Sequence, residues 1–223
     1  SQAMVKLMNH AGVDYAVLGT EETCTGDSAR RLGNEYLFQM MAHQNIETFD
    51  NYKVKKIITQ CPHCLNALKN DYASLGKNYE VIHHAEFLSD LVKAGKLTPS
   101  KANESKLSYH DSCYLGRHNG IYDAPRDVIK AIPGIRIEEF PRFGNESLCC
   151  GAGGGRMWLE ESLGEKTINV ERMEDVKAVK PDEVATACPF CATMINDGIK
   201  AEELDMSTAS KDIAQYLLDS IVE

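Results

Sequence analysis

Hydrophobic residues in the first half of the chain alternate between short runs typical of buried strands and longer patterns with helical spacing. Apolar runs of strand length occupy residues 13–18, 55–60 and 79–83. Helical patterns occupy residues 4–11, follow Asp27, and return after the third run at residues 87–92. Because strands and helices alternate, the pattern favours a parallel sheet with helices packed against it.

The second half repeats this order after a polar stretch, residues 95–106, which we interpret as a linker. Strand patterns lie at 107–110, 135–139 and 184–187, and helical patterns follow Asp123 and run over 213–221. The sequence therefore predicts an α/β fold of two similar Rossmann-like lobes, each a mostly parallel sheet flanked by helices. Lobe one spans residues 1–95 and lobe two spans residues 107–223.

The spacing of the cysteines supports this duplication. Cys61-Pro62-His63-Cys64 in lobe one matches Cys188-Pro189-Phe190-Cys191 in lobe two, and each motif directly follows a predicted strand. Cys24 lies 37 residues before Cys61, and Cys149 lies 39 residues before Cys188. A repeated spacing of this kind indicates two related supersecondary units.

Lobe one is shorter than lobe two at its N-terminal end. Lobe two has a further cysteine, Cys113, 36 residues before Cys149. The counterpart of Cys113 would lie about 12 residues before Ser1, after a strand that this sequence also lacks. We therefore expect a lobe one that is truncated at its N-terminus and has an incomplete cysteine site. Because the missing strand would expose a sheet edge, we also expect a tendency to form homo-oligomers.

Composition limits the classes of function. The chain has 223 residues, 43% of them hydrophobic, and a formal net charge of −9. An acidic chain without clustered Lys and Arg does not favour nucleic-acid binding. No apolar run reaches the roughly 18 residues of a membrane-spanning helix, and the N-terminus lacks the apolar core of a signal peptide. We therefore expect a cytoplasmic protein without direct membrane insertion.

Five cysteines of lobe two follow predicted strands: Cys113, Cys149, Cys150, Cys188 and Cys191. Since the carboxyl ends of parallel strands meet at one edge of a sheet, we expect these thiols to converge there. In a reducing compartment, C-x-x-C pairs are typical of metal or redox sites rather than of a disulfide framework. Closely spaced thiolates repel one another, and a metal ion or an iron–sulfur cluster neutralises them.

The segments around these cysteines resemble the cysteine-rich CCG domain family at His110-Asp111-Ser112-Cys113, Cys149-Cys150-Gly151 and Cys188-Pro189-Phe190-Cys191. That family includes the cysteine-rich subunit of heterodisulfide reductase, the iron–sulfur subunit of glycolate oxidase and lactate-utilisation proteins. The resemblance implies an electron-transfer module with a [4Fe–4S] cluster, of the noncubane type in heterodisulfide reductase, bound by the five cysteines of lobe two. It also implies a partner, either an electron-transfer subunit or a flavoprotein.

Lobe one departs from the family pattern, because Thr25 follows Cys24 where the family often has a second cysteine. Three thiols remain as a second, incomplete metal site: Cys24, Cys61 and Cys64. Together with His83 or His84 they would suit zinc, which prefers four tetrahedral nitrogen and sulfur ligands. An empty or disulfide-bonded pair is an equally good interpretation of this lobe.

Two functions remain open from the sequence. The first is an iron–sulfur electron-transfer module, a subunit or fragment of an oxidoreductase, whose own enzymatic activity the sequence does not decide. The alternative is a zinc-binding structural or scaffolding protein without a redox role. His110 and His118, which flank Cys113, are expected to pack structurally or to support a ligand rather than to bind metal. His63 is expected at the exposed rim of the site.

Overall fold

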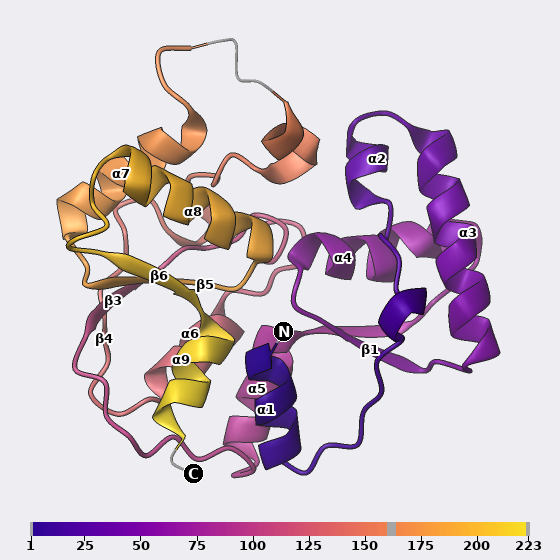
Figure 1. The fold of residues 1–223 in the computed structure, drawn as a ribbon, viewed down its shortest axis with the longest axis horizontal. Coiled ribbons are helices and arrows are strands. Elements are labelled where there is room, and N and C mark those ends of the chain that lie inside the picture. Colours follow the sequence, from indigo (N-terminus) through magenta and orange to yellow (C-terminus); the bar gives the residue numbers. More distant parts are fainter. Residues whose placement is uncertain (1, 160–163, 222–223) are drawn as a thin grey trace.

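The computed structural model describes residues 2–159 and 164–221 and confirms an α/β fold with two parallel sheets (Figure 1). The sheet of lobe one pairs β1 (Lys56–Thr59) with β2 (Glu80–His83). The sheet of lobe two has four strands in the order β4-β3-β5-β6, and all neighbours are parallel. The bounds of these strands are β3 (Lys106–Tyr109), β4 (Arg136–Ile137), β5 (Glu183–Thr186) and β6 (Ala209–Asp212).

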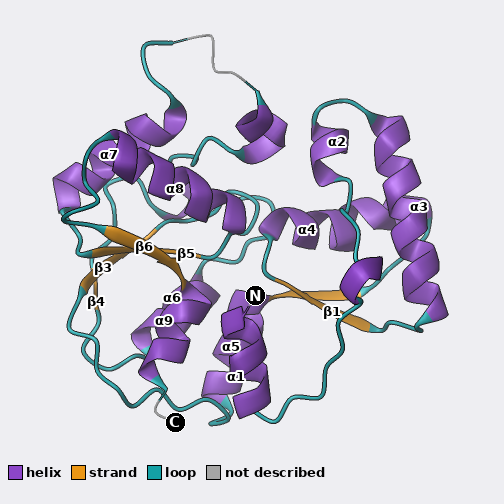
Figure 2. Ribbon diagram, viewed as in Figure 1, coloured by secondary structure: helices purple, strands orange, loops and turns teal. Residues whose placement is uncertain are grey.

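Helices cover both faces of the lobe-two sheet (Figure 2). On one face lie α7 (Ile168–Val179) and α8 (Pro189–Ala201), and on the other lie α6 (Asp123–Lys130) and α9 (Ile213–Ser220). Val176 of α7 and Ile195 of α8 are buried in one cluster with Val184 of β5. The apolar side of each helix therefore faces the sheet, as expected for a parallel sheet buried on both faces.

Lobe one contains the same kinds of element in the same order. Its helices are α1 (Gln2–His10), α2 (Asp27–Arg31), α3 (Glu35–Asn51), α4 (Pro62–Asn66) and α5 (His84–Lys93). A π-type turn over Ala67–Asp71 and a 3-10 turn over Tyr72–Leu75 continue α4. By position in the repeat, β1 corresponds to β5, β2 to β6, α1 to α6, and α5 to α9.

Two predicted elements of lobe one are different in the structure. Residues 13–18 form no strand. In lobe two the corresponding strand, β4, pairs only with β3, and the described part of lobe one has no counterpart of β3, so this run has no neighbour to bond. The helix expected after Asp27 is two helices, because the chain turns at Gly33 (φ 85°) and Asn34 then caps α3 by accepting the N–H of Leu37 at 3.0 Å.

The hydrophobic pattern also fails to predict β6. Its sequence, Ala209-Ser210-Lys211-Asp212, contains no apolar run. Because β6 is an edge strand with β5 as its one neighbour, its polar residues remain partly in water. Edge strands commonly carry such charged and polar residues.

The two lobes share one hydrophobic core. Packing of α1 against α9 is equivalent, under the repeat, to packing of α6 against α5, and α5 also packs against α9. Leu7, Leu88 and Val128 from these helices belong to one buried cluster. His84 Nε2 lies 3.1 Å from Asp212 Oδ1 and joins the first residue of α5 to the residue before α9. The relative placement of the two sheets is therefore set by buried helix packing.

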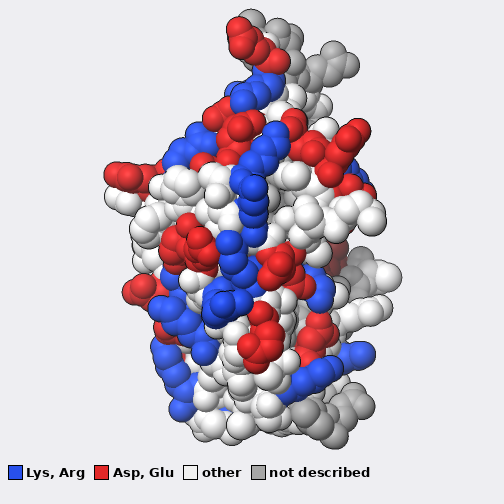
Figure 3. Space-filling model, turned by 90° about the vertical axis from the view of Figure 1, so that its left-hand side faces the viewer, with Lys and Arg blue, Asp and Glu red and all other residues white. Residues whose placement is uncertain are grey.

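The side of lobe two that lies at the left of Figure 1 carries charges of both signs (Figure 3). Lys and Arg are interspersed there with Asp and Glu, and ion pairs such as Lys166 to Glu171 at 2.6 Å join residues of lobe two. This face therefore offers a phosphate backbone no continuous basic surface. Among the described helices, none is long and apolar enough to cross a membrane.

Arg126 of α6 ties together the loops that follow β3 and β4. Its guanidinium group donates to both carboxylate oxygens of Asp111 at 2.8 Å and to those of Glu139 at 2.6 and 2.8 Å. Asp111 also accepts the N–H of Gly144 at 2.8 Å. Since Arg126 and Asp111 are buried, this bidentate pair is shielded from water. The clamp holds the loop that leads to Cys113 against the loop that leads to Cys149.

Replacing this clamp tests its contribution to stability. We expect Arg126→Met to lower the free energy of unfolding by about 3 kcal/mol, because it leaves the Asp111 carboxylate buried without its partner. The matched control is Lys93→Met, which removes an ion pair from a side chain that is 64% exposed and should change little. Urea unfolding followed by circular dichroism measures both, and equal losses would contradict the role of the clamp.

Candidate metal centre

Each C-x-x-C motif lies between a strand and the first turn of a helix. Cys61 follows β1 as the residue before α4, with Pro62 at the first helical position. Cys188 and Pro189 take the same positions between β5 and α8. Proline is favoured there because its fixed φ suits the helix and its missing N–H has no intrahelical acceptor to lose. The unpaired N–H groups of a helix N-terminus favour the thiolate form of a nearby cysteine.

The two motifs meet at the boundary between the lobes, where the thiols of Cys61 and Cys188 are hydrogen-bonded. In Figure 1 the ends of α4 and α8 lie next to each other in the middle of the molecule. Seven sulfur atoms, which we call the thiol row, are each hydrogen-bonded to the next in the order Cys64, Cys61, Cys188, Cys191, Cys150, Cys149 and Cys113. The structure thus brings the five expected cysteines of lobe two together and adds two from lobe one.

Hydrogen bonds along the thiol row divide it into ionised and protonated groups. Donation from Cys113 and Cys150 lowers the pKa of Cys149 to about 2. Burial raises the pKa of Cys188, but hydrogen bonds from Cys191 and from lobe one outweigh burial and hold this pKa well below its usual range. Donation to Cys149 in turn raises the pKa of Cys150 to about 12. The row sheds its other protons when a cation takes their place, and this donor set fits an iron–sulfur or metal centre.

The first cysteine of each repeat is held by the same turn. Cys149 Sγ accepts the N–H of Gly151 at 3.3 Å, and Cys24 Sγ accepts the N–H of Gly26 at 3.4 Å. Gly151 has φ 95° and Gly26 has φ 80°, values that side-chain-bearing residues rarely adopt. The C-x-G turn is therefore common to both lobes and aims its first thiol by the same backbone geometry.

The middle residue of this turn is where the lobes differ. Thr25 Oγ1 lies 3.7 Å from Cys64 Sγ, in the position where lobe two has the contact between Cys150 and Cys191. Cys24 lies outside the thiol row and is exposed. The backbone beside it is fixed by Asn45, whose amide donates to the Cys24 carbonyl at 2.9 Å. Lobe one therefore reproduces the turn without the second thiol.

The two histidines considered for a zinc site in lobe one are engaged elsewhere. His83 Nδ1 accepts the N–H of Ala85 at 3.3 Å, and its Nε2 lies 3.2 Å from the Gln60 carbonyl. His84 pairs with Asp212 across the lobe boundary. All eight cysteines carry free thiols, so neither motif is a disulfide here. Lobe one offers Cys24, Cys61 and Cys64 as donors without a histidine.

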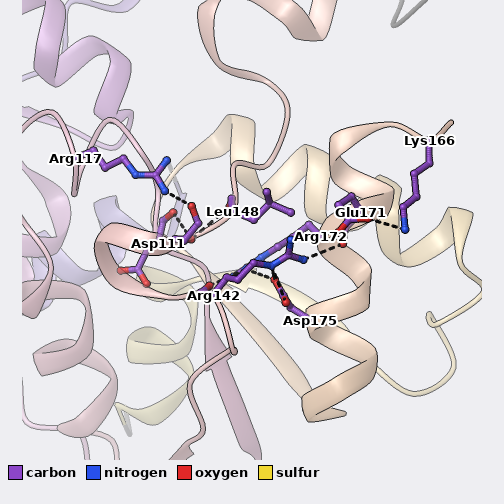
Figure 4. Close-up of polar contacts among 9 residues, drawn as sticks. Asp111, Arg117, Arg142, Leu148, Lys166, Glu171, Arg172 and Asp175 are labelled. Carbon is purple, nitrogen blue, oxygen red and sulfur yellow. Dashed lines mark hydrogen bonds and ion pairs between the residues drawn. The ribbon is translucent and has the colours of Figure 1, made fainter. Parts of the chain in front are cut away.

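Arg117 ties the loop after Cys113 to the loop before Cys149 (Figure 4). Its guanidinium group donates to the carbonyl of Asn145 at 2.9 Å and to the carbonyl of Ser147. Ser147 Oγ in turn donates to the Asp111 carbonyl at 3.3 Å. These bonds, together with the Arg126 clamp, hold the two cysteine loops of lobe two in contact before any ligand binds.

A short segment of lobe two, Gly153–Trp158, passes beside the thiol row and packs against α2 of lobe one. A Cβ atom placed on Gly153 would lie 4.0 Å from Cys113 Sγ. Gly155 has φ 79°, and a Cβ atom there would lie only 2.6 Å from Leu32 Cγ of lobe one. Glycine at position 155 therefore permits the two lobes to close over this side of the row.

Two histidines at the thiol row were given the wrong environment or too small a role by sequence reasoning. His63, expected at an exposed rim, is buried between the rings of Tyr114 at 4.2 Å and Phe190 at 5.0 Å. His110 is also buried, and burial lowers its pKa to about 3. One ring nitrogen of His110 lies within 4.8 Å of Cys150 Sγ and Cys191 Sγ. Proximity to the cysteines in sequence was the only signal for either residue.

The lowered pKa of Cys149 gives a test in the reduced, metal-free protein. A thiolate exists above its pKa, so we expect alkylation of Cys149 to stay nearly constant between pH 8 and pH 5. The rate for an ordinary thiol falls about tenfold per pH unit below its pKa of about 8.5. Peptide mass spectrometry after brief alkylation measures the rate.

Cys113→Ala is the matched control, because it removes the strongest hydrogen bond to Cys149 and should restore a steep dependence on pH. A steep fall in Cys149 labelling in the unaltered protein would contradict the ionised form.

Comparison with known proteins identifies related sequences. The model of the cysteine-rich CCG domain matches residues 1–69 and 107–196. The chain is 54% identical to the EtfAB:quinone oxidoreductase of Syntrophomonas wolfei, with 97% of this chain and 31% of that protein covered. It is 47% identical to the probable iron–sulfur-binding oxidoreductase FadF of Bacillus subtilis, with 99% and 31% covered.

A more distant relative belongs to the dihydromethanophenazine:CoB–CoM heterodisulfide reductase of Methanosarcina mazei, one of whose polypeptides is 35% identical over 92% of this chain and 51% of its own length. The chain thus spans about a third to a half of the length of these relatives. The family match covers both lobes and includes all eight cysteines. The chain therefore belongs to the cysteine-rich CCG domain family.

Proposed function

We propose that this chain is the iron–sulfur electron-transfer module of a larger oxidoreductase. The observation that carries the proposal is the unbroken contact among the five thiols of lobe two, from Cys113 to Cys188, at the carboxyl edge of one parallel sheet. Relatives with the same domain are named as oxidoreductases, and one of them as iron–sulfur-binding. Iron–sulfur clusters use cysteine thiolates as ligands, and this row supplies them.

The number of thiols favours a cluster over zinc. A structural zinc ion takes four ligands in a tetrahedron, so a fifth thiol in contact with the others would be left without a role. A centre with several irons has room for Cys113, Cys149, Cys150, Cys188 and Cys191 together. We therefore assign a [4Fe–4S] centre of noncubane type to lobe two, and we assign the three thiols of lobe one, Cys24, Cys61 and Cys64, to a second site that lacks a full donor set.

The module needs partners, because it carries no flavin or nicotinamide motif. The name of one relative joins EtfAB to a quinone, and we propose that this chain lies between an electron-donating flavoprotein and a quinone-type acceptor. When bound, the cluster supplies one-electron transfer. The protein's own residues hold the thiols in place, exclude water and balance charge. Eight free thiols support a location in the reducing cytoplasm.

Metal analysis distinguishes the two functions left open by the sequence. After anaerobic reconstitution with iron and sulfide, we expect the chain to bind iron and to absorb broadly in the visible range, with bleaching on reduction. A zinc scaffold would bind zinc in preference and remain colourless. Elemental analysis and an anaerobic spectrum decide between them, and a colourless protein with stoichiometric zinc and no iron would reject the electron-transfer proposal.

A second prediction concerns the ligand set of lobe two. We expect Cys191→Ser to abolish or severely reduce iron binding, because a hydroxyl group is a poor substitute for a thiolate in the middle of the thiol row. Cys24→Ser is the matched control, since Cys24 is exposed and lies outside the row. Iron per chain after reconstitution is the measurement. Normal iron content in the Cys191 variant would remove this residue from the ligand set.

A further inference from the structure

His110 is a buried polar side chain that the fold itself leaves without a partner. It follows β3 directly, and its backbone N–H is fixed by the Ala185 carbonyl of β5 at 2.9 Å. The side chain is 1% exposed, and within the described residues neither Nδ1 nor Nε2 has a hydrogen-bond partner. Leaving a buried donor or acceptor unpaired costs about 1–3 kcal/mol. A ring with two such atoms therefore implies a partner that binds at this place.

The surroundings of the ring indicate what that partner is. One ring nitrogen, Cys150 Sγ and Cys191 Sγ all lie within 4.8 Å of one another, and the described chain has no other group of three His, Cys, Asp or Glu donors this close. The ring forms no direct hydrogen bond with either thiol. Since a metal–sulfur bond is about 2.3 Å long, an atom of a bound centre fits among the three groups.

A buried cation lies beside the ring. Arg172 of α7 is fully buried, and its Nη1 donates to Asp175 at 2.6 Å and to the Arg142 carbonyl at 2.9 Å (Figure 4). Its guanidinium group also stacks over the ring of Phe140 at 4.2 Å. These contacts fix its position, while Nε and Nη2 have no partner in the part of the chain that the structure describes.

Arg172 decides the orientation of the imidazole proton. Its positive charge opposes protonation of His110, so the ring is neutral, with one N–H donor and one lone pair. The tautomer of lowest energy turns its lone pair to the cation and its N–H to the negative charge of the thiolates. A neutral ring held in this way donates a hydrogen bond to sulfur and does not ligate iron.

We propose that the His110 ring donates an N–H···S hydrogen bond to the iron–sulfur centre of lobe two and thereby raises its reduction potential. The inference rests on the proposed function and deepens it, because it names a residue that sets the potential. Reduction adds negative charge to the sulfur atoms, so the hydrogen bond strengthens in the reduced state. Hydrogen bonds to cluster sulfurs are among the factors that set cluster potentials.

The test compares three variants of the full chain, reconstituted anaerobically with iron and sulfide. His110→Leu removes the donor, and we expect about a tenfold lower ratio of reduced to oxidised centre at a fixed potential, equivalent to about 59 mV for a one-electron couple. His110→Gln keeps an N–H donor and should recover part of this change. His118→Phe is the matched control: His118 is exposed and stacks on Tyr114 at 4.3 Å, and phenylalanine keeps the stack.

Redox titration followed by electron paramagnetic resonance measures the ratio, with iron content measured in each sample. An unchanged potential in His110→Leu at full iron content would overturn the inference while leaving the proposed function intact. Pulsed resonance on the unaltered protein covers the case in which that variant does not fold. An exchangeable proton coupled to the centre supports the hydrogen bond, and the strong coupling of a directly bound nitrogen overturns it. Failure of the unaltered protein to bind iron would instead reject the proposed function.

Discussion

Thiol groups in contact inside a protein cannot all ionise, because each thiolate raises the pKa of its neighbours. In the thiol row this constraint leaves Cys149 and Cys188 ionised, each accepting hydrogen bonds from the thiols beside it. The remaining protons leave only if positive charge arrives. The features around the row follow from that requirement: the helix N-termini at the two C-x-x-C motifs, the buried Arg172, and the N–H groups turned to sulfur at Gly26 and Gly151.

The row also depends on how the two lobes are joined. Its central contact, between Cys61 and Cys188, lies at equivalent positions of the repeat and is therefore the point where the two copies meet. The packing of α1 on α9 and of α5 on α6 is exchanged by the same equivalence. A single core across both lobes keeps the strand ends of the two sheets together. Loss of that packing would separate the thiols even if each lobe stayed folded.

Local patterns were sufficient to predict much of this arrangement, and contacts between lobes were not. Strands at 56–59 and 183–186 and the C-x-x-C motifs after them follow from apolar runs and motif spacing. The burial of His63 depends on Tyr114 of the other lobe, and no pattern around residue 63 encodes it. The polar strand β6 exists because β5 offers it an edge, whereas residues 13–18 have an apolar pattern but no neighbour in the described sheet. Local sequence thus specifies where cysteines leave strands, and tertiary packing specifies which of them touch.

The two copies of the repeat have diverged in ways that assign them different tasks. Lobe two keeps a second thiol at Cys150, while lobe one has Thr25 in the same turn, with its hydroxyl group directed at Cys64. Lobe one has His63 in its C-x-x-C motif, and lobe two has Phe190, the two rings packing together at the boundary. Sulfur donors are therefore concentrated in lobe two, and lobe one supplies two thiols and a covering ring. A duplicated fold has in this way become one asymmetric centre, in which the lobe that is poorer in donors shields the lobe that is richer in them.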